Sequence, residues 1–270
     1  MPDIVHRETG IRIFQYPGDS LAAADLAGAV LAYGRMNGLD FRGANLRGAD
    51  LCIGELQGAD FEGADLTGAD LSGSDLNGAN LSGATLVGTR ILGANLTGTR
   101  FERTDLERVS MKLAAGTGTD FREARFRRAD LSHTGLTEAD FTGADLTEAC
   151  MLQGNFSGAC FRHATLASAY LACADLQRAD LRGADLTHAV LAGSRLSGAA
   201  FRNATFLKTV LADLPDLHLA TGLDEITHLG DSSLDIHTLR RSAPSLPETF
   251  LARLGLTPEE IQAFRTFQPA

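Results

Sequence analysis

An apolar residue recurs at every fifth position from Phe41 to Leu211, and this regularity restricts the folds that the chain can adopt. Leu, Phe, Met or Ile occupies every position on that count except Gly116. A smaller residue, most often Ala, lies two places before each apolar residue, and Gly often lies two places after it. A helix repeats its faces about every 3.6 residues and a strand every second residue, so neither fits a period of five. The chain must therefore turn once per repeat, with the glycine at the corner.

Phenylalanine marks a longer period inside the shorter one. Seven phenylalanines fall on spacings of 20 residues or multiples of 20: Phe41, Phe61, Phe101, Phe121, Phe141, Phe161 and Phe201. Four repeats therefore make one square coil, and like side chains stack on like, as in a solenoid whose coils contact only their neighbours. We expect an all-β solenoid of about 8 to 9 coils, with an interior too thin for a ligand cavity and a cap at each end.

The repeat resembles the consensus A(D/N)LXX of the pentapeptide-repeat family. Ala44-Asn45-Leu46, Ala64-Asp65-Leu66 and Ala184-Asp185-Leu186 match that consensus, and the resemblance covers about two thirds of the 270 residues. The resemblance implies a right-handed quadrilateral β-helix, a handedness that the spacing alone does not show.

The ends of the chain depart from the period. Residues 1–21 are expected to form N-terminal cap strands, because Ile4, Val5, Ile11, Ile13 and Phe14 predict one or two short strands that close at Pro17-Gly18. The β-helix is expected over residues 22–211, with a helix at residues 20–33 as the alternative. Residues 212–270 are expected to form a C-terminal helical module.

Three short helices are predicted within that module. Ser232-Ser233 is expected to cap the first, which continues through Leu239. Pro247 opens the second and Gly255 ends it. Thr257-Pro258-Glu259-Glu260 is a strong start for the third, because a capping hydroxyl, a proline and acidic residues all favour the first turn.

Composition narrows the class of protein. No run approaches the ~20 apolar residues of a membrane span, and the first residues lack the character of a signal region, so a cytoplasmic protein is expected. The net charge is −10, and it is blocked along the chain, with an acidic run from Asp50 to Asp75 and an arginine-rich stretch from Arg90 to Arg128. We interpret four cysteines without metal-ligand spacing as free thiols in a reducing compartment: Cys52, Cys150, Cys160 and Cys173.

No catalytic, cofactor-binding or metal-binding residues are predicted, and the protein is not expected to be an enzyme. His133, His163 and His188 fall on three different faces of the rod, so they cannot form one metal site. The glycines follow the corner period and not the pattern of a phosphate loop. The arginine-rich stretch is the candidate for binding nucleic acid, but the outer faces of the rod lack aromatic residues on which bases could stack, apart from Tyr170, so direct binding is not favoured.

Two features exceed what a purely structural rod requires. An apolar stripe is predicted over several coils: Cys150, Leu152, Tyr170, Val190 and Val210. Contiguous exposed apolar surface usually marks an interface, so we expect the C-terminal helices or a second subunit to cover it. The other feature is Gly116, where a core side chain is missing, and which predicts a break in the solenoid: a local kink or a flexible patch.

These features favour a protein-binding rod. Members of the family that protect type II topoisomerases such as gyrase from inhibitors are rods with partly acidic surfaces that mimic duplex DNA and dimerise through a C-terminal helical part, and the resemblance implies such a partner here. The predicted acidic faces comprise seven aspartates: Asp60, Asp65, Asp120, Asp140, Asp145, Asp180 and Asp185. The alternative is an adaptor or regulatory module without DNA mimicry, because the body lacks projecting loops and interleaves arginines with these aspartates.

Overall fold

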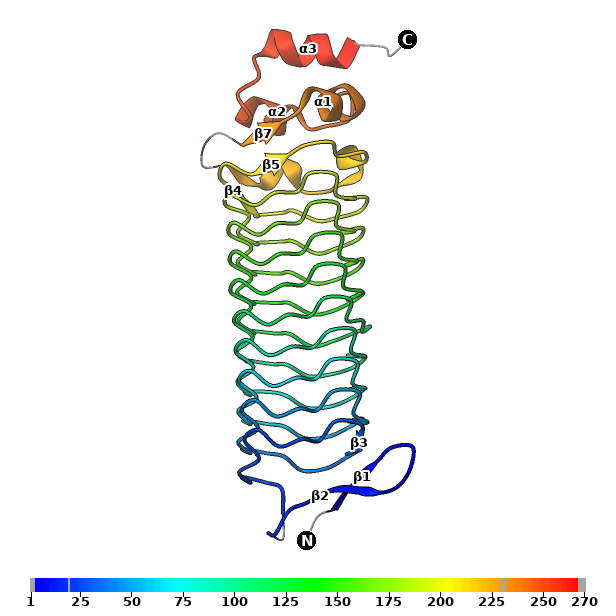
Figure 1. Ribbon diagram of the computed structural model, residues 1–270. Coiled ribbons are helices and arrows are strands. Elements are labelled where there is room, and N and C mark those ends of the chain that lie inside the picture. Colours follow the sequence, from blue (N-terminus) through cyan, green and yellow to red (C-terminus); the bar gives the residue numbers. More distant parts are fainter. Residues whose placement is uncertain (1–2, 19, 229, 231, 267–270) are drawn as a thin grey trace.

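The chain winds into a rod of stacked coils in the computed structural model, which describes residues 3–18, 20–228, 230 and 232–266 (Figure 1). Parallel bridges join residues 20 apart, from the pair Asp25 and Asn45 to the pair Val190 and Val210. Each coil therefore contains four five-residue sides. The 20-residue period inferred from the phenylalanines is the period of the backbone.

Each five-residue side ends in a hydrogen-bonded corner. The amide of Ala44 donates to the carbonyl of Phe41 at 3.0 Å, and corresponding bonds recur along the rod. The carboxylate of Asp60 accepts the amide of Glu62 at 3.1 Å, which explains why Asp or Asn so often precedes the core residue. The residue two places after the core residue has a positive φ, such as 65° at Gly63, and this is the conformation that glycine adopts without steric cost.

The core is a set of columns of like side chains. The rings of Phe101, Phe121, Phe141 and Phe161 stack with successive centroid distances of 5.0, 4.9 and 4.8 Å. All four side chains are fully buried. The small residues form a second buried set, in which hydroxyls replace alanine where they find a carbonyl. The hydroxyl of Thr99, for example, donates to the carbonyl of Leu76 at 2.8 Å.

The N-terminal end carries an antiparallel hairpin, and its turn lies between His6 and Arg12, before Pro17-Gly18. Strand β1 (Asp3–His6) pairs with β2 (Arg12–Gln15) and with β3 (Gly34–Arg35), and Ile4 is fully buried. The alternative helix at residues 20–33 is wrong, because Asp25 and Val30 already form bridges to the next coil.

The chain leaves the five-residue period after β4 (Thr205–Phe206) and β5 (Val210–Leu211). Two 3-10 turns and two strands follow: η1 (Leu217–Leu219), η2 (Leu223–Glu225), β6 (Thr227–His228) and β7 (Ser233–Leu234). Strand β6 pairs in parallel with β4, and β7 with β5, so the tail continues the ladder before the helices begin.

Three helices stack beyond the last coil, at the C-terminal end of the rod (Figure 1): α1 (Ile236–Ser242), α2 (Glu248–Arg253) and α3 (Pro258–Thr266). The predicted start of the first helix is wrong. Asp235 caps α1 by accepting the amides of His237 and Thr238, while Ser233 lies in β7. Asp235 is the better cap because its carboxylate accepts two amide hydrogens, whereas Ser233 is held by its pairing with β5.

Candidate functional site

The corners of the rod carry the outward side chains. The residue that follows each core residue lies at a corner, and residues 20 apart lie above one another along the same corner. We call one corner the charged corner, with nine residues: Arg42, Glu62, Ser82, Glu102, Arg122, Thr142, Arg162, Arg182 and Arg202. The opposite corner, ten residues out of phase, is largely apolar and includes Cys52, Leu92, Leu152, Ala172 and Ala192.

The seven predicted aspartates lie in two columns, as expected, but few are neighbours. Asp120 bridges to Asp140, whereas Asn80, Arg100 and Cys160 separate the other members of that column. In the second column Arg125 and Thr165 flank Asp145. Every one of the seven accepts the amide two residues further on, at 2.9 to 3.2 Å. The local turn therefore accounts for their presence.

Arginines neutralise most of these carboxylates. Ion pairs join Asp65 to Arg47 at 3.0 Å, Asp120 to Arg122 at 2.6 Å and Asp145 to Arg127 at 3.3 Å. Asp180 pairs with both Arg162 and Arg182, and Asp60 lies 3.8 Å from Arg42. Within the described residues, Asp140 and Asp185 have no ion-pair partner, and each accepts a threonine hydroxyl instead.

The arginine contacts also affect protonation. Burial alone would raise the pKa of Asp120, but hydrogen bonds from the side chain and the amide of Arg122 outweigh it and lower that pKa. The pKa values of Asp65 and Asp145 are lowered in the same way, against burial, by Thr67 and Thr147 and by the neighbouring arginines. These carboxylates are charged at neutral pH, but their charge is paired.

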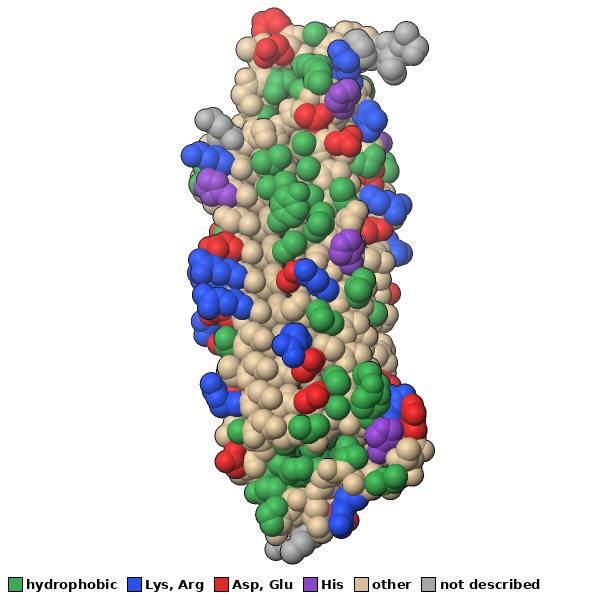
Figure 2. Space-filling view, in the orientation of Figure 1, with side chains coloured by type: hydrophobic (Ala, Val, Ile, Leu, Met, Phe, Trp, Pro, Cys, Tyr) green, Lys and Arg blue, Asp and Glu red, His purple; other side chains and the backbone are tan. Residues whose placement is uncertain are grey.

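The apolar stripe lies exposed on the side of the rod. Tyr170 is 45% exposed, and the side chains of Cys150, Leu152, Val190 and Val210 are half-buried. Figure 2 shows hydrophobic side chains gathered over the coils next to the C-terminal module. The expectation that the C-terminal helices cover the stripe is wrong, because these helices pack against the end of the rod (Figure 1). Cover by a second subunit stays a prediction.

The solenoid is continuous at Gly116, so the predicted break is wrong. The ladder passes through this repeat, since Ala115 bridges both Asn95 and Gly135, and the amide of Gly116 donates to the carbonyl of Gly135 at 2.8 Å. No empty space is left for a side chain. A Cβ atom on Gly116 would lie 2.7 Å from the hydroxyl oxygen of Thr119 and 2.8 Å from the carbonyl oxygen of Leu96, so neighbouring atoms already fill the position.

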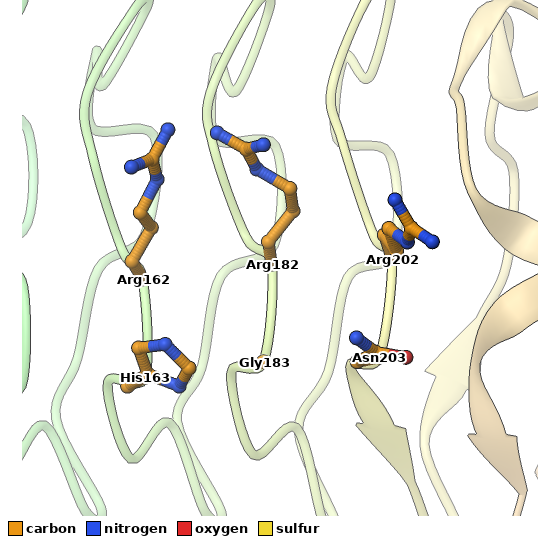
Figure 3. A pocket seen from close by; sticks show the side chains of 6 residues that line it. All are labelled: Arg162, His163, Arg182, Gly183, Arg202 and Asn203. Atoms are coloured by element: carbon orange, nitrogen blue, oxygen red, sulfur yellow. The ribbon is translucent and has the colours of Figure 1, made fainter.

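A groove lined by arginines on the charged corner is a feature that sequence reasoning missed. Arg162, Arg182 and Arg202 follow one another on successive coils, with His163 and Asn203 below them (Figure 3). The groove has a volume of about 300 Å³. The signal that could have revealed it is the 20-residue spacing of the three arginines, the same spacing that marks the phenylalanine column.

The described residues bring no three His, Cys, Asp or Glu side chains together in a group that could hold a metal ion. The four cysteines are free thiols, as predicted, and Cys173 is the exposed one. None of the helices in the described part of the chain is long and apolar enough to cross a membrane.

Comparison with known protein families agrees with this geometry. The family described as "Pentapeptide repeats" matches in eight copies, over residues 20–52, 55–93, 74–112, 94–132, 124–162 and 169–206. The chain belongs to the pentapeptide-repeat family. Membership confirms the resemblance seen in the repeat and implies a right-handed quadrilateral β-helix. Proteins of this kind are binding or structural proteins in general.

Solved structures of other family members are similar to this pentapeptide-repeat protein. HetL from the cyanobacterium Nostoc sp. strain PCC 7120, involved in heterocyst differentiation regulation, is 30% identical with a TM-score of 0.60, over 73% of this chain and 84% of HetL. QnrB1, a plasmid-mediated fluoroquinolone resistance protein, is 19% identical with a TM-score of 0.39, over 74% of this chain and 91% of QnrB1. No curated protein matches.

Proposed function

We propose that this pentapeptide-repeat protein is a non-catalytic protein-binding rod that docks a protein partner on the apolar stripe. The exposure of Tyr170 beside Val190 supports the proposal most, because contiguous exposed apolar surface usually marks an interface. Tyrosine is also enriched among the residues that dominate binding energy. HetL is involved in regulation of differentiation, and we propose a comparable adaptor or regulatory role here.

The test places a photo-crosslinking amino acid at Tyr170 and, as the matched control, at Thr137, which lies on a different part of the rod surface. We expect a specific adduct in host cells from position 170 only. The captured protein is then purified and its affinity measured by calorimetry against the wild type and Tyr170→Ser. Loss of a central aromatic contact should weaken binding at least about tenfold. Equal adducts from both positions, or unchanged affinity, would contradict the proposal.

The DNA-mimic role in protecting gyrase is the second candidate. The two aspartate columns and the family resemblance support it, in particular the adjacent pair Asp120 and Asp140. The ion pairs to Arg47, Arg122 and Arg127 count against it, because a duplex mimic needs unpaired negative charge. We therefore favour the adaptor role.

One assay separates the two candidates. Supercoiling by purified gyrase is followed with and without an inhibitor at rising concentrations of the protein. Inhibition or protection, lost in Asp120→Asn with Asp140→Asn, would favour the mimic, whereas no effect on gyrase is expected for the adaptor.

The same proposal assigns a role to each of the three parts of the chain. We propose that residues 1–21 cap the first coil, that residues 22–211 carry the partner, and that residues 212–270 close the other end in the cytoplasm. The gyrase candidate, unlike the adaptor role, would bring with it a homodimer through the C-terminal part, where Leu219 and Ile236 are exposed.

A further inference from the structure

Charge is segregated along the charged corner. Towards the N-terminal end, Glu62 and Glu102, together with Arg103, line a groove of about 350 Å³, which we call the acidic groove. Towards the C-terminal end, Arg162, Arg182 and Arg202 line the groove of about 300 Å³ described above, which we call the basic groove (Figure 3). Both grooves lie on the same corner, because the two glutamates and the three arginines of the basic groove share the 20-residue phase.

The basic groove has more guanidinium groups than directly paired carboxylates. Arg162 and Arg182 share one carboxylate, that of Asp180, and Arg202 pairs with Glu225 at 2.7 Å. Two carboxylates therefore form ion pairs with three guanidinium groups, and Asp140 also attracts Arg162 without pairing with it. All three arginine side chains are about half exposed, so their remaining donors are open to an external acceptor.

The acidic groove is complementary to it. Glu62 has no ion-pair partner within the described residues, and it is exposed. Glu102 contacts Arg103 and Arg122, each at 3.3 Å, and Arg103 is also held by Glu123 at 2.9 Å. The carboxylate of Glu62 is therefore open to an external guanidinium group.

We propose that two copies of this chain associate side by side and antiparallel along the charged corner, with the acidic groove of each on the basic groove of the other. A two-fold axis between the levels of Arg122 and Thr142 sets the register. Glu102 then faces Arg162 of the partner subunit, and Glu62 faces Arg202 of the partner subunit. Each contact occurs twice, as in any isologous dimer.

The register is unique along this corner. A shift of one coil in one direction sets Arg122 against Arg122 of the partner subunit, and a shift in the other direction sets it against Arg162 of the partner subunit. A parallel pair in register would oppose like charges at every charged level. Among the nine residues of the charged corner, only the proposed antiparallel register gives two Glu–Arg contacts from each copy and opposes no two arginines. Other registers oppose like charges or give fewer Glu–Arg contacts.

Salt distinguishes this dimer from an apolar one. The chain carries a net charge of −10, so two copies repel, and salt that screens the repulsion should strengthen association through an apolar surface. Association through exposed ion pairs should instead weaken as salt rises. The dimer would also leave both apolar stripes facing outward, so it goes beyond the proposed function and does not depend on it.

Sedimentation velocity of the full chain is the test. Between about 0.1 M and about 1 M NaCl the Debye length falls from about 10 Å to about 3 Å, and we expect the dimer dissociation constant to rise at least about tenfold. A wild type that stays monomeric at low salt, or a dimer that strengthens with salt, would overturn the proposal.

Charge-reversal variants provide a second test of the dimer. Glu62→Arg with Glu102→Arg, and separately Arg162→Glu with Arg202→Glu, should each lose the homodimer, while an equimolar mixture should form a heterodimer. Recovery in the mixture also shows that both variants fold. The control, Arg108→Glu with Arg128→Glu, reverses two arginines at a different corner and should leave the dimer unchanged. A dimer that survives reversal would belong to the C-terminal part or the apolar stripe and would refute the proposal.

Discussion

The backbone of Gly116 lies so close to Leu96 that a Cβ atom on Gly116 would stand 2.6 Å from the carbonyl carbon of Leu96. Gly116→Leu completes the five-residue period, yet the structure predicts that it destabilises the rod by ~1–3 kcal/mol through overpacking. Gly116→Ala should destabilise in the same sense. Denaturant unfolding followed by circular dichroism measures both, and a gain in stability for Gly116→Leu would contradict the close approach.

The phenylalanine column should respond to truncation according to volume. Phe121 contacts the rings of Phe101, Phe126 and Phe141. We expect Phe121→Ala to lower the free energy of unfolding by ~3–5 kcal/mol. Phe121→Leu should cost only about 1 kcal/mol, since leucine occupies the same column naturally at positions 81 and 181. Chemical denaturation measures the loss of unfolding free energy in each variant. Equal losses would contradict the prediction that side-chain volume determines the cost.

Leu113 holds a left-handed backbone conformation that suits glycine. Its φ is 60° and its side chain is 68% exposed. Leu113→Gly relieves strain of ~1–2 kcal/mol, partly offset by the ~0.4–1 kcal/mol of entropy that glycine adds to the unfolded chain. Leu113→Ala keeps the strain and serves as the control. Thermal unfolding should rank the glycine variant above the alanine variant, and the reverse order would contradict the prediction.

The cysteines should differ in their reactivity with thiol reagents. Partial burial and the neighbouring Asp50 raise the pKa of the Cys52 thiol to about 11. At about pH 8 the thiolate is scarce, and Cys52 should react about a hundredfold more slowly than an ordinary free thiol. Cys173 is exposed. Alkylation resolved by peptide mass spectrometry should label Cys173 first, and equal rates would show that the burial of Cys52 is transient.

Acid should remove the contribution of Asp120 to the stability of the folded protein. Its pKa in the folded protein lies below the ordinary 3.8, so its stabilisation is present above that value and is lost as pH falls through the folded pKa. Asp120→Asn keeps an acceptor for the Arg122 amide but removes the charge. We expect the variant to be less stable by about 1 kcal/mol or less at about pH 6, and the difference to vanish once the pH lies below the folded pKa. Thermal melts of both proteins at falling pH test the sign.

The five-residue repeat is sufficient to predict the core of the rod from the sequence. Contacts on the surface and at the ends of the rod are harder to predict. Phe41 and Phe61 stack at 4.8 Å because residues 20 apart must lie on one column. The close approach of Gly116 to Leu96 depends on the backbone path where a core side chain is missing, and no residue pattern specifies that path.

The errors at the ends and on the surface have a common physical origin. The sequence predicts Ser233 as a helix cap, but Ser233 pairs with Val210 of β5 instead, and such pairing depends on where the tail folds back. The aspartates were grouped by column, but the arginines that pair with them lie at corner positions, such as Arg47 18 residues before Asp65. Side-chain reach between columns decides these contacts, and the period alone does not specify it.

The four-sided coil has a consequence for how this rod can change. Because each side contains five residues, inserting or deleting one repeat would rotate everything beyond it by a quarter of a revolution, whereas a change of 20 residues would only alter the length. One added repeat near Gly143 would carry Arg162 and Arg202 to a different side from Glu62, with the core pattern intact. The number of residues between two surface groups, counted modulo 20, therefore determines the angle between them around the axis of the rod.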